Sequence, residues 1–440
     1  MVKVGFISLG CSKNLVDTEV MLRVLHERGY EITPDETEAE IIIVNTCGFI
    51  ESAKQESIDN ILDTDKLKTL GKCRHIIATG CLVERYREEV MKELPEVDAL
   101  VGVGSIFDIA DACDAVLRGE KYTSFKDKNT SPLGGERILT TDEHTAYLKI
   151  AEGCDNLCTY CAIPLIRGRL RSRPIEDIVK EAKDLESLGV KELNLIAQDT
   201  TRYGLDLYGE YSLARLVREL TEKTDIPWIR LLYCYPDKIT DELIYELKNN
   251  PRLLKYMDIP IQHISDKILT RMNRHGGSAL IRETVKRLRR EVPGIVLRTT
   301  AMVGFPGEGE EEFSELCEFV KETKFERFGA FTYSEEEGTG AATLDGKVDE
   351  QTKQDRYDIL MQTQLTATEN LGLEKIGKTE KVLCDGYDTV AEIYYGRSYA
   401  DAPDVDGRVY FTSNRRICAG EFVNVKITES VDYDLVGHTV

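Results

Sequence analysis

The sequence predicts an α/β protein with an N-terminal parallel-sheet α/β domain, a central open (β/α) barrel and a small C-terminal antiparallel β-barrel. Three observations predict this fold class. Short apolar runs alternate with helical stretches over residues 1–117 and again over 144–330, which is typical of parallel strands covered by helices. A polar segment, residues 118–143, lies between these regions and is predicted to be a linker. Residues 373–440 carry short apolar runs punctuated by Gly and Asp, the pattern of a small barrel.

Four apolar runs rich in β-branched residues predict the strands of the N-terminal domain. They are Val2–Leu9, Ile41–Thr46, His75–Gly80 and Ala99–Val103. A helical pattern runs from Asn14 to Arg28 and ends at Gly29, because glycine readily adopts the left-handed conformation that terminates helices. Further helical stretches lie between the other runs, so we expect residues 1–117 to form one domain.

Six strand–helix units predict the central part. Its candidate strands are Tyr147–Glu152, Glu192–Ala197, Trp228–Leu232, Tyr256–Pro260, Val296–Val303 and Arg327–Phe331. Six units fit an open (β/α) barrel better than a full eight-stranded one, and in either form functional sites gather at the C-terminal ends of the strands. A charged helix over residues 350–371 follows, so we place this part at residues 144–372 and the small barrel at 373–440.

The charge of the chain bears on its partners. It has 57 basic and 78 acidic residues, a formal net charge of -21. Such a surface repels phosphate backbones, and no run of Lys and Arg forms a basic patch. An acidic excess is also common in ordinary soluble proteins, but a partner selected by charge would be basic.

The cysteine count bears on the cellular compartment. The first residues, MVKVGFISLGC, hold an apolar run too short for a secretory signal, and we expect it to form a buried strand. No stretch is long enough to span a membrane. We therefore expect a cytoplasmic protein with reduced thiols, in which clusters among the 12 cysteines indicate metal binding rather than disulfides.

The strongest functional signal is GCDNLCTYCAIP, residues 153–164, where Cys154, Cys158 and Cys161 form a CxxxCxxC triplet. The triplet follows the first predicted barrel strand, where a barrel enzyme keeps its site. Structural zinc sites and closed iron–sulfur clusters use four ligands, and no fourth Cys or His lies nearby in sequence. We therefore interpret the triplet as the holder of an iron–sulfur cubane with one iron open to a small molecule, with zinc as the alternative.

Three more cysteines, Cys11, Cys47 and Cys81, each directly follow a predicted strand of the N-terminal domain. Carboxyl ends of adjacent parallel strands line one crevice, so thiolates far apart in sequence can meet there. We interpret them as the ligands of a second cluster; the alternative is that they are small buried hydrophobic residues. The remaining six cysteines are expected to be packing residues: Cys73, Cys113, Cys234, Cys317, Cys384 and Cys418.

Several motifs together resemble the methylthiotransferase family of the radical S-adenosylmethionine (radical SAM) superfamily, over essentially the whole chain. They are SLGCSKNLVDTE (Ser8–Glu19), AEGCDNLCTYCAIPLIRGRLRSRP (Ala151–Pro174), LIAQDTTRYG (Leu195–Gly204), MDIPIQHISDKILTRMNR (Met257–Arg274) and GFPGE (Gly304–Glu308). They are most similar to the branch of the family that modifies an aspartate of small-subunit ribosomal protein twelve. The sister branch acts on adenosines of transfer RNA.

The resemblance implies a methylthiotransferase N-terminal domain, a radical SAM core and a C-terminal TRAM domain. It implies two 4Fe–4S clusters, the auxiliary one on the three strand-end cysteines and the radical SAM one on the CxxxCxxC triplet. One S-adenosylmethionine molecule then yields the radical that removes hydrogen from the aspartate β-carbon, another donates the methyl group, and sulfur is delivered at the auxiliary cluster. The implied partners are ribosomal protein twelve, an electron donor and a sulfur donor.

Six residues near the ends of barrel strands are further candidates for cofactor binding: Gln198, Asp199, Gln262, Gly304, Gly307 and Glu308. Polar side chains at the first three positions would point into the site. The last three belong to GFPGE, and in the family this region borders the S-adenosylmethionine site. The alternatives are loop capping for the first three residues and an ordinary strand-to-helix turn for the others.

An arginine-rich segment, Arg167–Arg173, follows the cysteine triplet. It would either bind a carboxylate or phosphate or cover a solvated face, and we favour the solvated face.

Two other functions stay open, a transfer-RNA methylthiotransferase and an iron–sulfur electron carrier or scaffold. Tyrosines of residues 373–440 could stack on RNA bases, although strands also use them for core packing. The same segment carries twelve acidic and eight basic residues, which suits a basic ribosomal protein better than RNA.

Overall fold

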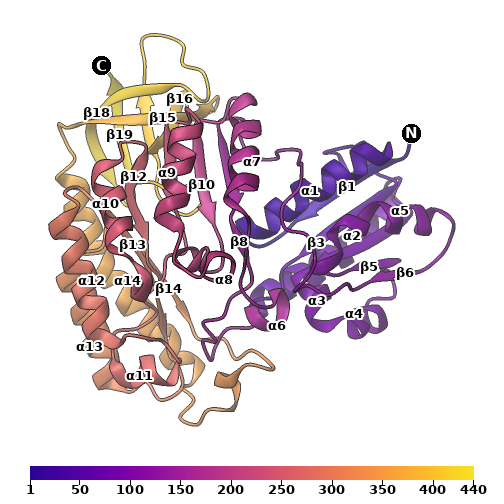
Figure 1. The fold of residues 1–440 in the computed structure, drawn as a ribbon, viewed down its shortest axis with the longest axis horizontal. Coiled ribbons are helices and arrows are strands. Elements are labelled where there is room, and N and C mark those ends of the chain that lie inside the picture. The colour runs from indigo at the N-terminus through magenta and orange to yellow at the C-terminus, as the bar shows by residue number, and fades with distance from the viewer.

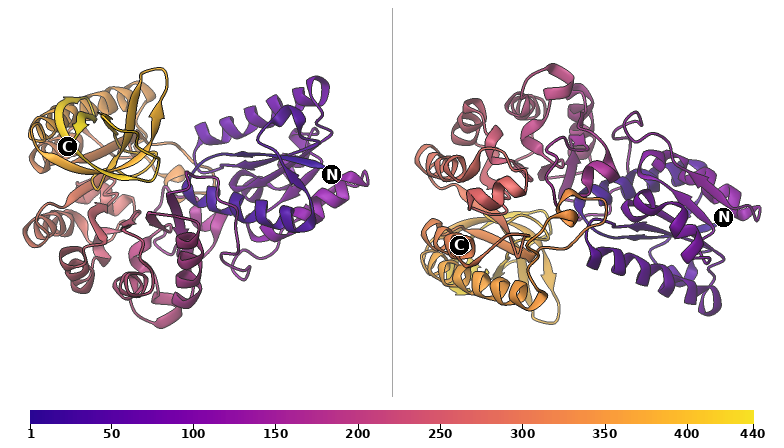
Figure 2. Two further views of the ribbon diagram at one scale, coloured as in Figure 1. Left: turned by 90° about the horizontal axis from the view of Figure 1, so that it is seen from above. Right: turned by 90° about the horizontal axis from the view of Figure 1, so that it is seen from below.

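The computed structural model describes residues 1–440 as three sheets with their helices, joined in chain order (Figure 1). A six-stranded parallel sheet comes first, a second six-stranded parallel sheet follows, and a closed five-stranded barrel ends the chain. We call them the N-terminal sheet, the central sheet and the C-terminal barrel. In both views of Figure 2 the N-terminal sheet lies to one side of the other two. This arrangement confirms the predicted fold class.

The N-terminal sheet has the strand order β2-β1-β3-β4-β5-β6. Its strands are β1 (Lys3–Ser8), β2 (Glu31–Ile32), β3 (Ile41–Thr46), β4 (His75–Gly80), β5 (Ala99–Val101) and β6 (Tyr122–Ser124). The two short edge strands, β2 and β6, were not predicted. Strand β6 lies within residues 118–143, the segment expected to be a linker, and pairs in parallel with β5.

Helices cover both faces of the N-terminal sheet. They are α1 (Ser12–Arg28), α2 (Glu51–Leu70), α3 (Cys81–Tyr86), α4 (Glu88–Glu93) and α5 (Ile109–Leu117), with 3-10 turns η1 (Glu36–Glu38) and η2 (Val103–Asp108). Alternate residues of β3 enter different cores: Ile41 packs with Met21 of α1, and Ile42 with Ile61 of α2. Because both faces are covered, every residue of β3 is buried, as its unbroken apolar run predicts.

The central sheet has the sequential order β14-β13-β12-β11-β10-β7, and its two outer strands do not pair, so the barrel is open. Its strands are β7 (Thr145–Lys149), β10 (Glu192–Ile196), β11 (Trp228–Leu231), β12 (Leu253–Asp258), β13 (Val296–Val303) and β14 (Arg327–Thr332). Two short strands, β8 (Ala151–Glu152) and β9 (Arg171–Ser172), pair beside it and flank the cysteine triplet.

Helices cover the outer face of the central sheet, as Figure 1 shows. They are α7 (Ile175–Ser187), α8 (Leu205–Tyr208), α9 (Leu213–Lys223), α10 (Asp241–Asn249), α11 (Asp266–Arg271), α12 (Gly277–Glu291), α13 (Glu310–Thr323) and α14 (Glu350–Leu373), with 3-10 turns η3 (Thr200–Arg202), η4 (Pro236–Lys238) and η5 (Gly340–Thr343). The short helix α6 (Ile163–Arg167) instead packs against α3 of the N-terminal part. The largest hydrophobic core of the molecule lies between this sheet and its helices.

The C-terminal barrel closes in the order β15-β16-β17-β19-β18. Its strands are β15 (Thr379–Asp388), β16 (Ile393–Ser398), β17 (Val409–Thr412), β18 (Phe422–Val431) and β19 (Asp434–Thr439). All but one of its pairings are antiparallel, as predicted; β17 and β19 are parallel. The chain leaves β17 by a long crossover to β18, so the hairpin that follows returns β19 in the direction of β17.

The three parts share a buried junction. One hydrophobic cluster joins Val16 of α1, Trp228 and Tyr256 of the central sheet, and Leu383 and Ala402 of the C-terminal barrel. Contact between the parts therefore rests on side-chain packing as well as on chain connectivity. No helix of the structure is long and apolar enough to cross a membrane.

Candidate active site between the two parallel sheets

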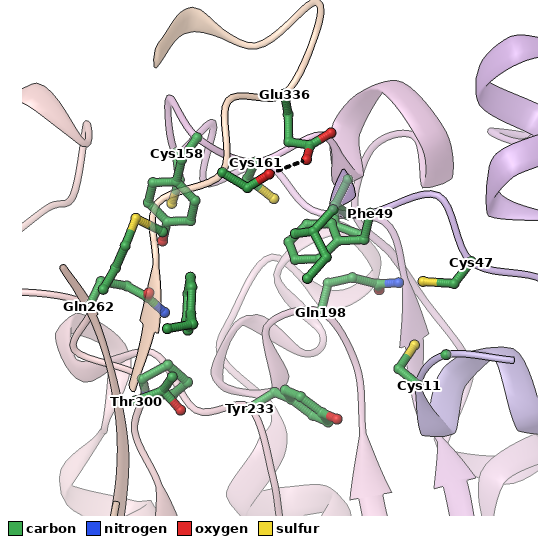
Figure 3. Close-up of a pocket in the computed structure, with 18 of the residues that line it drawn as sticks. Cys11, Cys47, Phe49, Cys158, Cys161, Gln198, Tyr233, Gln262, Thr300 and Glu336 are labelled. Carbon is green, nitrogen blue, oxygen red and sulfur yellow. Dashed lines mark hydrogen bonds between the residues drawn. The ribbon is translucent and has the colours of Figure 1, made fainter. Parts of the chain in front are cut away.

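A cavity of about 1320 Å³ lies where the N-terminal and central sheets meet, and all six cysteines singled out in the sequence line it. Figure 3 shows Cys158 and Cys161 on one side of this cavity and Cys11 and Cys47 on the other, with Gln198 between them. The structure therefore brings residues from two distant parts of the chain to one shared cavity. Its wall also includes a loop of the C-terminal barrel at Asp404.

Cys11, Cys47 and Cys81 follow β1, β3 and β4, which are neighbours in the N-terminal sheet. Glycines allow the three loops to touch. A Cβ added to Gly10, whose φ is +85°, would lie 3.0 Å from the Cys47 sulfur, and one added to Gly48 would lie 2.7 Å from the Leu82 backbone. The loops are thus packed against one another at the carboxyl edge of the sheet.

Cys154, Cys158 and Cys161 lie on the loop between β8 and α6. The loop begins at Gly153, where a Cβ would come within 2.0 Å of the Arg169 carbonyl oxygen, so only glycine fits. It is fixed further along, because the Thr159 N–H donates to the Met272 carbonyl oxygen at 3.0 Å. All three cysteines are partly buried and form no disulfide.

Neither triplet is as compact as the ligand set of a single zinc ion. The tetrahedral site of one zinc ion needs sulfur atoms about 3.8 Å apart, from Zn–S bonds of about 2.3 Å. In neither triplet do all three sulfurs lie within 4.8 Å of one another; only Asp142, His144 and Asp385 form such a compact group. Thiolates on different corners of a cubane are more widely spaced than the ligands of one zinc ion.

Burial also controls the ionisation of these thiols. Burial raises the pKa of Cys154 and of Cys161 to about 12, and that of Cys81 to about 11. The thiols are therefore protonated at neutral pH until a cation binds, and loading iron must release their protons.

Arg167 of α6, the helix that follows the CxxxCxxC loop, reaches Cys81 of the other triplet. Its guanidinium is buried and donates hydrogen bonds to Asp17 at 2.6 Å, Glu152 at 3.1 Å, Asn14 at 3.1 Å and the Cys81 sulfur at 3.4 Å. The favoured prediction of a solvated face is therefore wrong for this residue, because buried carboxylates from α1 and β8 surround it. Arg173 is buried too, against Glu181, whereas Arg169 is exposed as expected.

Lys149 completes this buried charge cluster. Its ammonium pairs with Asp17 and, at 2.8 Å, with Glu152. Burial alone would raise the pKa of Glu152, but the charges of Arg167 and Lys149 outweigh it and hold that pKa well below its usual range. The side-chain amide of Gln198 donates to the same carboxylate at 2.6 Å. The cluster thus ties the ends of β7 and β10 to helix α1.

The predicted cofactor residues at the ends of β10 and β12 have different environments. Gln198 and Gln262 line the cavity. Gln262 has a left-handed φ of 68° and a buried side-chain oxygen without a hydrogen-bond partner. Asp199 does not line the cavity; it accepts hydrogen bonds from Thr201 and, at 2.7 Å, from Asn156. This geometry favours the loop-capping alternative for Asp199.

Gly304, Gly307 and Glu308 do not line the cavity. The Glu308 carboxylate is buried, where it accepts from the Gly304 N–H at 3.0 Å and from Arg356 at 2.9 Å. The left-handed φ values of Gly304 and Gly307 allow the turn, since a Cβ at either position would collide with a neighbouring side chain. These residues shape the loop after β13.

Several residues of the site were not singled out in the sequence. Arg274 lies 4.1 Å above the Tyr235 ring and donates to the Tyr160 hydroxyl at 3.3 Å, beside Cys158. Tyr233 reaches across to helix α1, where its hydroxyl lies 3.5 Å from that of Ser12. They lie on loops after β11 and α11, and no spacing rule in the sequence indicates that they meet the cysteines. Of the six cysteines expected to pack in cores, only Cys418 is exposed.

Three family models match the chain. Residues 3–102 match the "Uncharacterized protein family UPF0004", residues 148–320 the "Radical SAM superfamily", and residues 376–440 the "TRAM domain". Each model falls on a different one of the three sheets; the first ends before β6 and the second before β14.

Curated relatives match over their full length. The "Ribosomal protein uS12 methylthiotransferase RimO" of Thermoanaerobacter sp. (strain X514) is 50% identical over 438 residues, covering 99% of this chain and 100% of that protein. The protein of the same name from Acetivibrio thermocellus is 50% identical over 451 residues, covering 100% of this chain and 98% of its own. That of Clostridium tetani (strain Massachusetts / E88) is 49% identical over 437 residues, covering 99% and 98%.

Solved structures share the fold at low identity. The radical S-adenosylmethionine methyltransferase TsrM from Kitasatospora setae matches with a TM-score of 0.56 and 14% identity, covering 76% of this chain and 72% of that one. The cobalamin-dependent S-adenosylmethionine radical enzyme OxsB matches with a TM-score of 0.51 and 12% identity, covering 84% and 56%. At such identities the likeness concerns the fold alone.

Proposed function

The chain belongs to the ribosomal protein uS12 methylthiotransferase family within the radical SAM superfamily, and from this premise we propose that it attaches a methylthio group to the β-carbon of an aspartate in uS12. The observation that carries the proposal is the meeting of two cysteine triplets, from separate sheets, in one cavity. Each triplet supplies three thiolates, so each cluster would keep one iron free for another ligand. We place the proposed domains at residues 1–117, 144–372 and 373–440, with 118–143 between the first two and its strand β6 added to the N-terminal sheet.

We assign the radical SAM 4Fe–4S cluster to Cys154, Cys158 and Cys161, and the auxiliary 4Fe–4S cluster to the other triplet. When bound, the cofactors supply an electron, a carbon radical able to remove hydrogen, sulfur and a methyl group. The chain positions them: the Gly153 turn and the Thr159 contact hold one loop, and the glycine contacts of Gly10 and Gly48 hold the other.

Gln262 is the residue that we propose for direct contact with S-adenosylmethionine. Its strained backbone and unpartnered side-chain oxygen are the features of a group held ready for a ligand. Gln198, which also lines the cavity, would make a further contact with the cofactor. We propose that Asp199 and Glu308, with Gly304 and Gly307, act indirectly by fixing the loops after β10 and β13.

The charge of the chain supports a protein substrate that is basic. At a net charge of -21 it repels nucleic acid, so RNA would be met only as part of the ribosome. We propose that the enzyme works in the cytoplasm with an electron donor and a sulfur donor supplied by other components.

The proposal is tested with anaerobically reconstituted enzyme, S-adenosylmethionine, a reductant and a sulfide source. Purified uS12 and transfer RNA are offered in separate reactions and analysed by mass spectrometry. We expect the mass of one methylthio group on uS12 and none on transfer RNA. Modification of transfer RNA alone would replace this proposal by the sister activity, and absence of 5′-deoxyadenosine would favour an electron carrier or scaffold.

A further inference from the structure

Lys13 is a cation in the cavity without an anionic partner. It lies in the first turn of α1, two residues after Cys11, and only 7% of its surface is exposed. Its ammonium lies 3.1 Å from the centre of the Tyr233 ring, at the cavity wall. A partly desolvated ammonium over an aromatic face keeps hydrogen-bond donors free, because the ring offers no lone pair.

The other basic side chains that line the cavity are already engaged. Arg167, Arg298, Lys347 and Lys353 each pair with a carboxylate. Arg274 has no carboxylate partner, but it donates to the Pro260 carbonyl oxygen at 2.5 Å and to the Tyr160 hydroxyl. Lys13 is therefore the one cation in this space that can receive an anion without breaking an existing contact.

The residue that holds Lys13 is itself strained. Tyr233 follows β11 with a left-handed φ of 60°, a costly conformation for an aromatic residue. Its N–H donates to Asp258 at 2.9 Å, and its hydroxyl lies 3.5 Å from the Ser12 hydroxyl. In Figure 3 its side chain extends from the barrel toward Cys11. The strain places one ring across the boundary between the two sheets, under the Lys13 ammonium.

We propose that Lys13 binds the side-chain carboxylate of the substrate aspartate. This rests on the proposed function and names the group that selects its substrate. A carboxylate entering a cavity without a counter-charge is heavily penalised. The β-carbon is one bond from the carboxyl carbon, so a single ion pair at Lys13 fixes the reacting carbon beside the auxiliary triplet. An adenine base carries no such anion and gains nothing from this lysine.

A purely structural role for Lys13 is the competing explanation, in which its ammonium only ties α1 to Tyr233. The two roles differ in what they require of the substrate. A structural lysine affects every substrate equally, whereas a carboxylate-binding lysine affects aspartate and not its neutral amide. The test is therefore a double-mutant cycle between Lys13 and the substrate side chain.

The experiment measures binding of uS12, and of its variant with Asn at the modified position, to the anaerobically reconstituted holoenzyme without S-adenosylmethionine. Wild-type enzyme is compared with Lys13→Met, with iron and sulfide content measured on both. We expect Lys13→Met to weaken binding of the Asp substrate about tenfold to hundredfold, as for loss of a charged hydrogen bond. Binding of the Asn variant should stay the same, and wild type should prefer Asp.

The matched control is Lys347→Met, which removes a paired lysine from the same cavity and should keep the wild-type preference for Asp over Asn. If Lys13→Met fails to fold or to load iron, Lys13→Arg and Lys13→Gln replace it; only the first should retain the preference. Equal losses of binding on both substrates, or no preference for Asp in the wild-type enzyme, would overturn the proposed role of Lys13. The proposed function would be unaffected by either result. If wild-type enzyme leaves uS12 unmodified, the proposed function fails and this inference fails with it.

Discussion

At the scale of single residues, Arg167 is a buried cation whose replacement should be costly. It is the shared partner of two buried carboxylates, Asp17 on helix α1 and Glu152 on strand β8. Arg167→Met would leave Lys149 alone to balance both. We expect a loss of about 3–5 kcal/mol in the free energy of unfolding, the usual cost of removing one member of a buried ion pair.

Urea unfolding followed by circular dichroism measures this loss. Arg169→Met is the matched control two residues away: its side chain is 81% exposed, so its free energy of unfolding should change by less than about 0.5 kcal/mol. A similar effect of both substitutions would show that the buried charge cluster does not stabilise the molecule.

The six cysteines should divide into two functional sets. Replacing Cys158 by Ala should lower the iron content to that of one cluster and abolish formation of 5′-deoxyadenosine from S-adenosylmethionine. Replacing Cys47 should also remove one cluster, but cleavage should continue while methylthiolation of uS12 stops. Iron analysis and chromatography of the products check both. Loss of cleavage with Cys47→Ala would contradict the division.

At the scale of elements, the loop before α1 depends on Gly10. Gly10→Ala adds a Cβ 2.9 Å from the Cys47 Cβ at a backbone φ of +85°. The substitution should displace Cys47, so the iron content should fall toward that of one cluster.

Gly29→Ala is the matched control at the other end of the same helix. Its φ is also left-handed, at +95°, but nothing lies within 4 Å of an added Cβ. It should cost about 1 kcal/mol of backbone strain and leave the iron content unchanged. Equal iron loss in both variants would mean that strain, and not contact with Cys47, explains the effect.

Helices and strands could be predicted where the pattern that indicates them lies within one short stretch of sequence. The apolar run of β3 indicates a strand buried on both faces, and the strand-end cysteines follow from parallel topology. The edge strands β2 and β6 are only two and three residues long, too short for any periodicity to appear. The parallel pairing of β17 with β19 depends on a crossover that sequence spacing does not encode.

The site was predictable in part for the same reason. Six cysteines were recognised because spacing and strand ends bring them together. The burial of Arg167 was not, since it depends on Asp17, 150 positions away in sequence. Lys13 is left without an anionic partner because it lies over Tyr233, while the neighbouring cations are held by carboxylates or, for Arg274, by neutral oxygen acceptors. These are properties of the assembled cavity.

At the scale of the whole molecule, buried ion pairs join the C-terminal barrel to the central sheet. Arg397 of β16 pairs with Glu192 of β10 and with Asp385, which also accepts from His144 at 2.8 Å. Burial alone would raise the pKa of both carboxyls. The charges of Arg397 and Arg230 outweigh burial at Glu192, and His144 with Arg397 outweighs it at Asp385, so both pKa values lie below their ordinary range.

The lowered pKa values determine how the contact responds to acid. A carboxyl with a lowered folded-state pKa adds stability above its unfolded pKa, and this stability is lost as the pH falls through the folded value. We therefore expect full stability above about pH 5 and a decline below about pH 4.3, near the unfolded pKa of Glu. The single tryptophan, Trp228, reports the change, because it packs on Phe422 of the barrel with ring centres 4.9 Å apart.

Tryptophan emission during urea unfolding, repeated across this pH range, checks the prediction. The wild-type midpoint should fall as the pH drops below about 4.3. Arg397→Met should begin from a lower midpoint at neutral pH and depend less on acid, since it removes the charge that lowers both carboxyl pKa values. Arg415→Met, at a 60% exposed arginine of the same barrel, should follow the wild-type profile. A wild-type midpoint that is flat in acid would mean that packing around Trp228, without these ion pairs, holds the barrel in place.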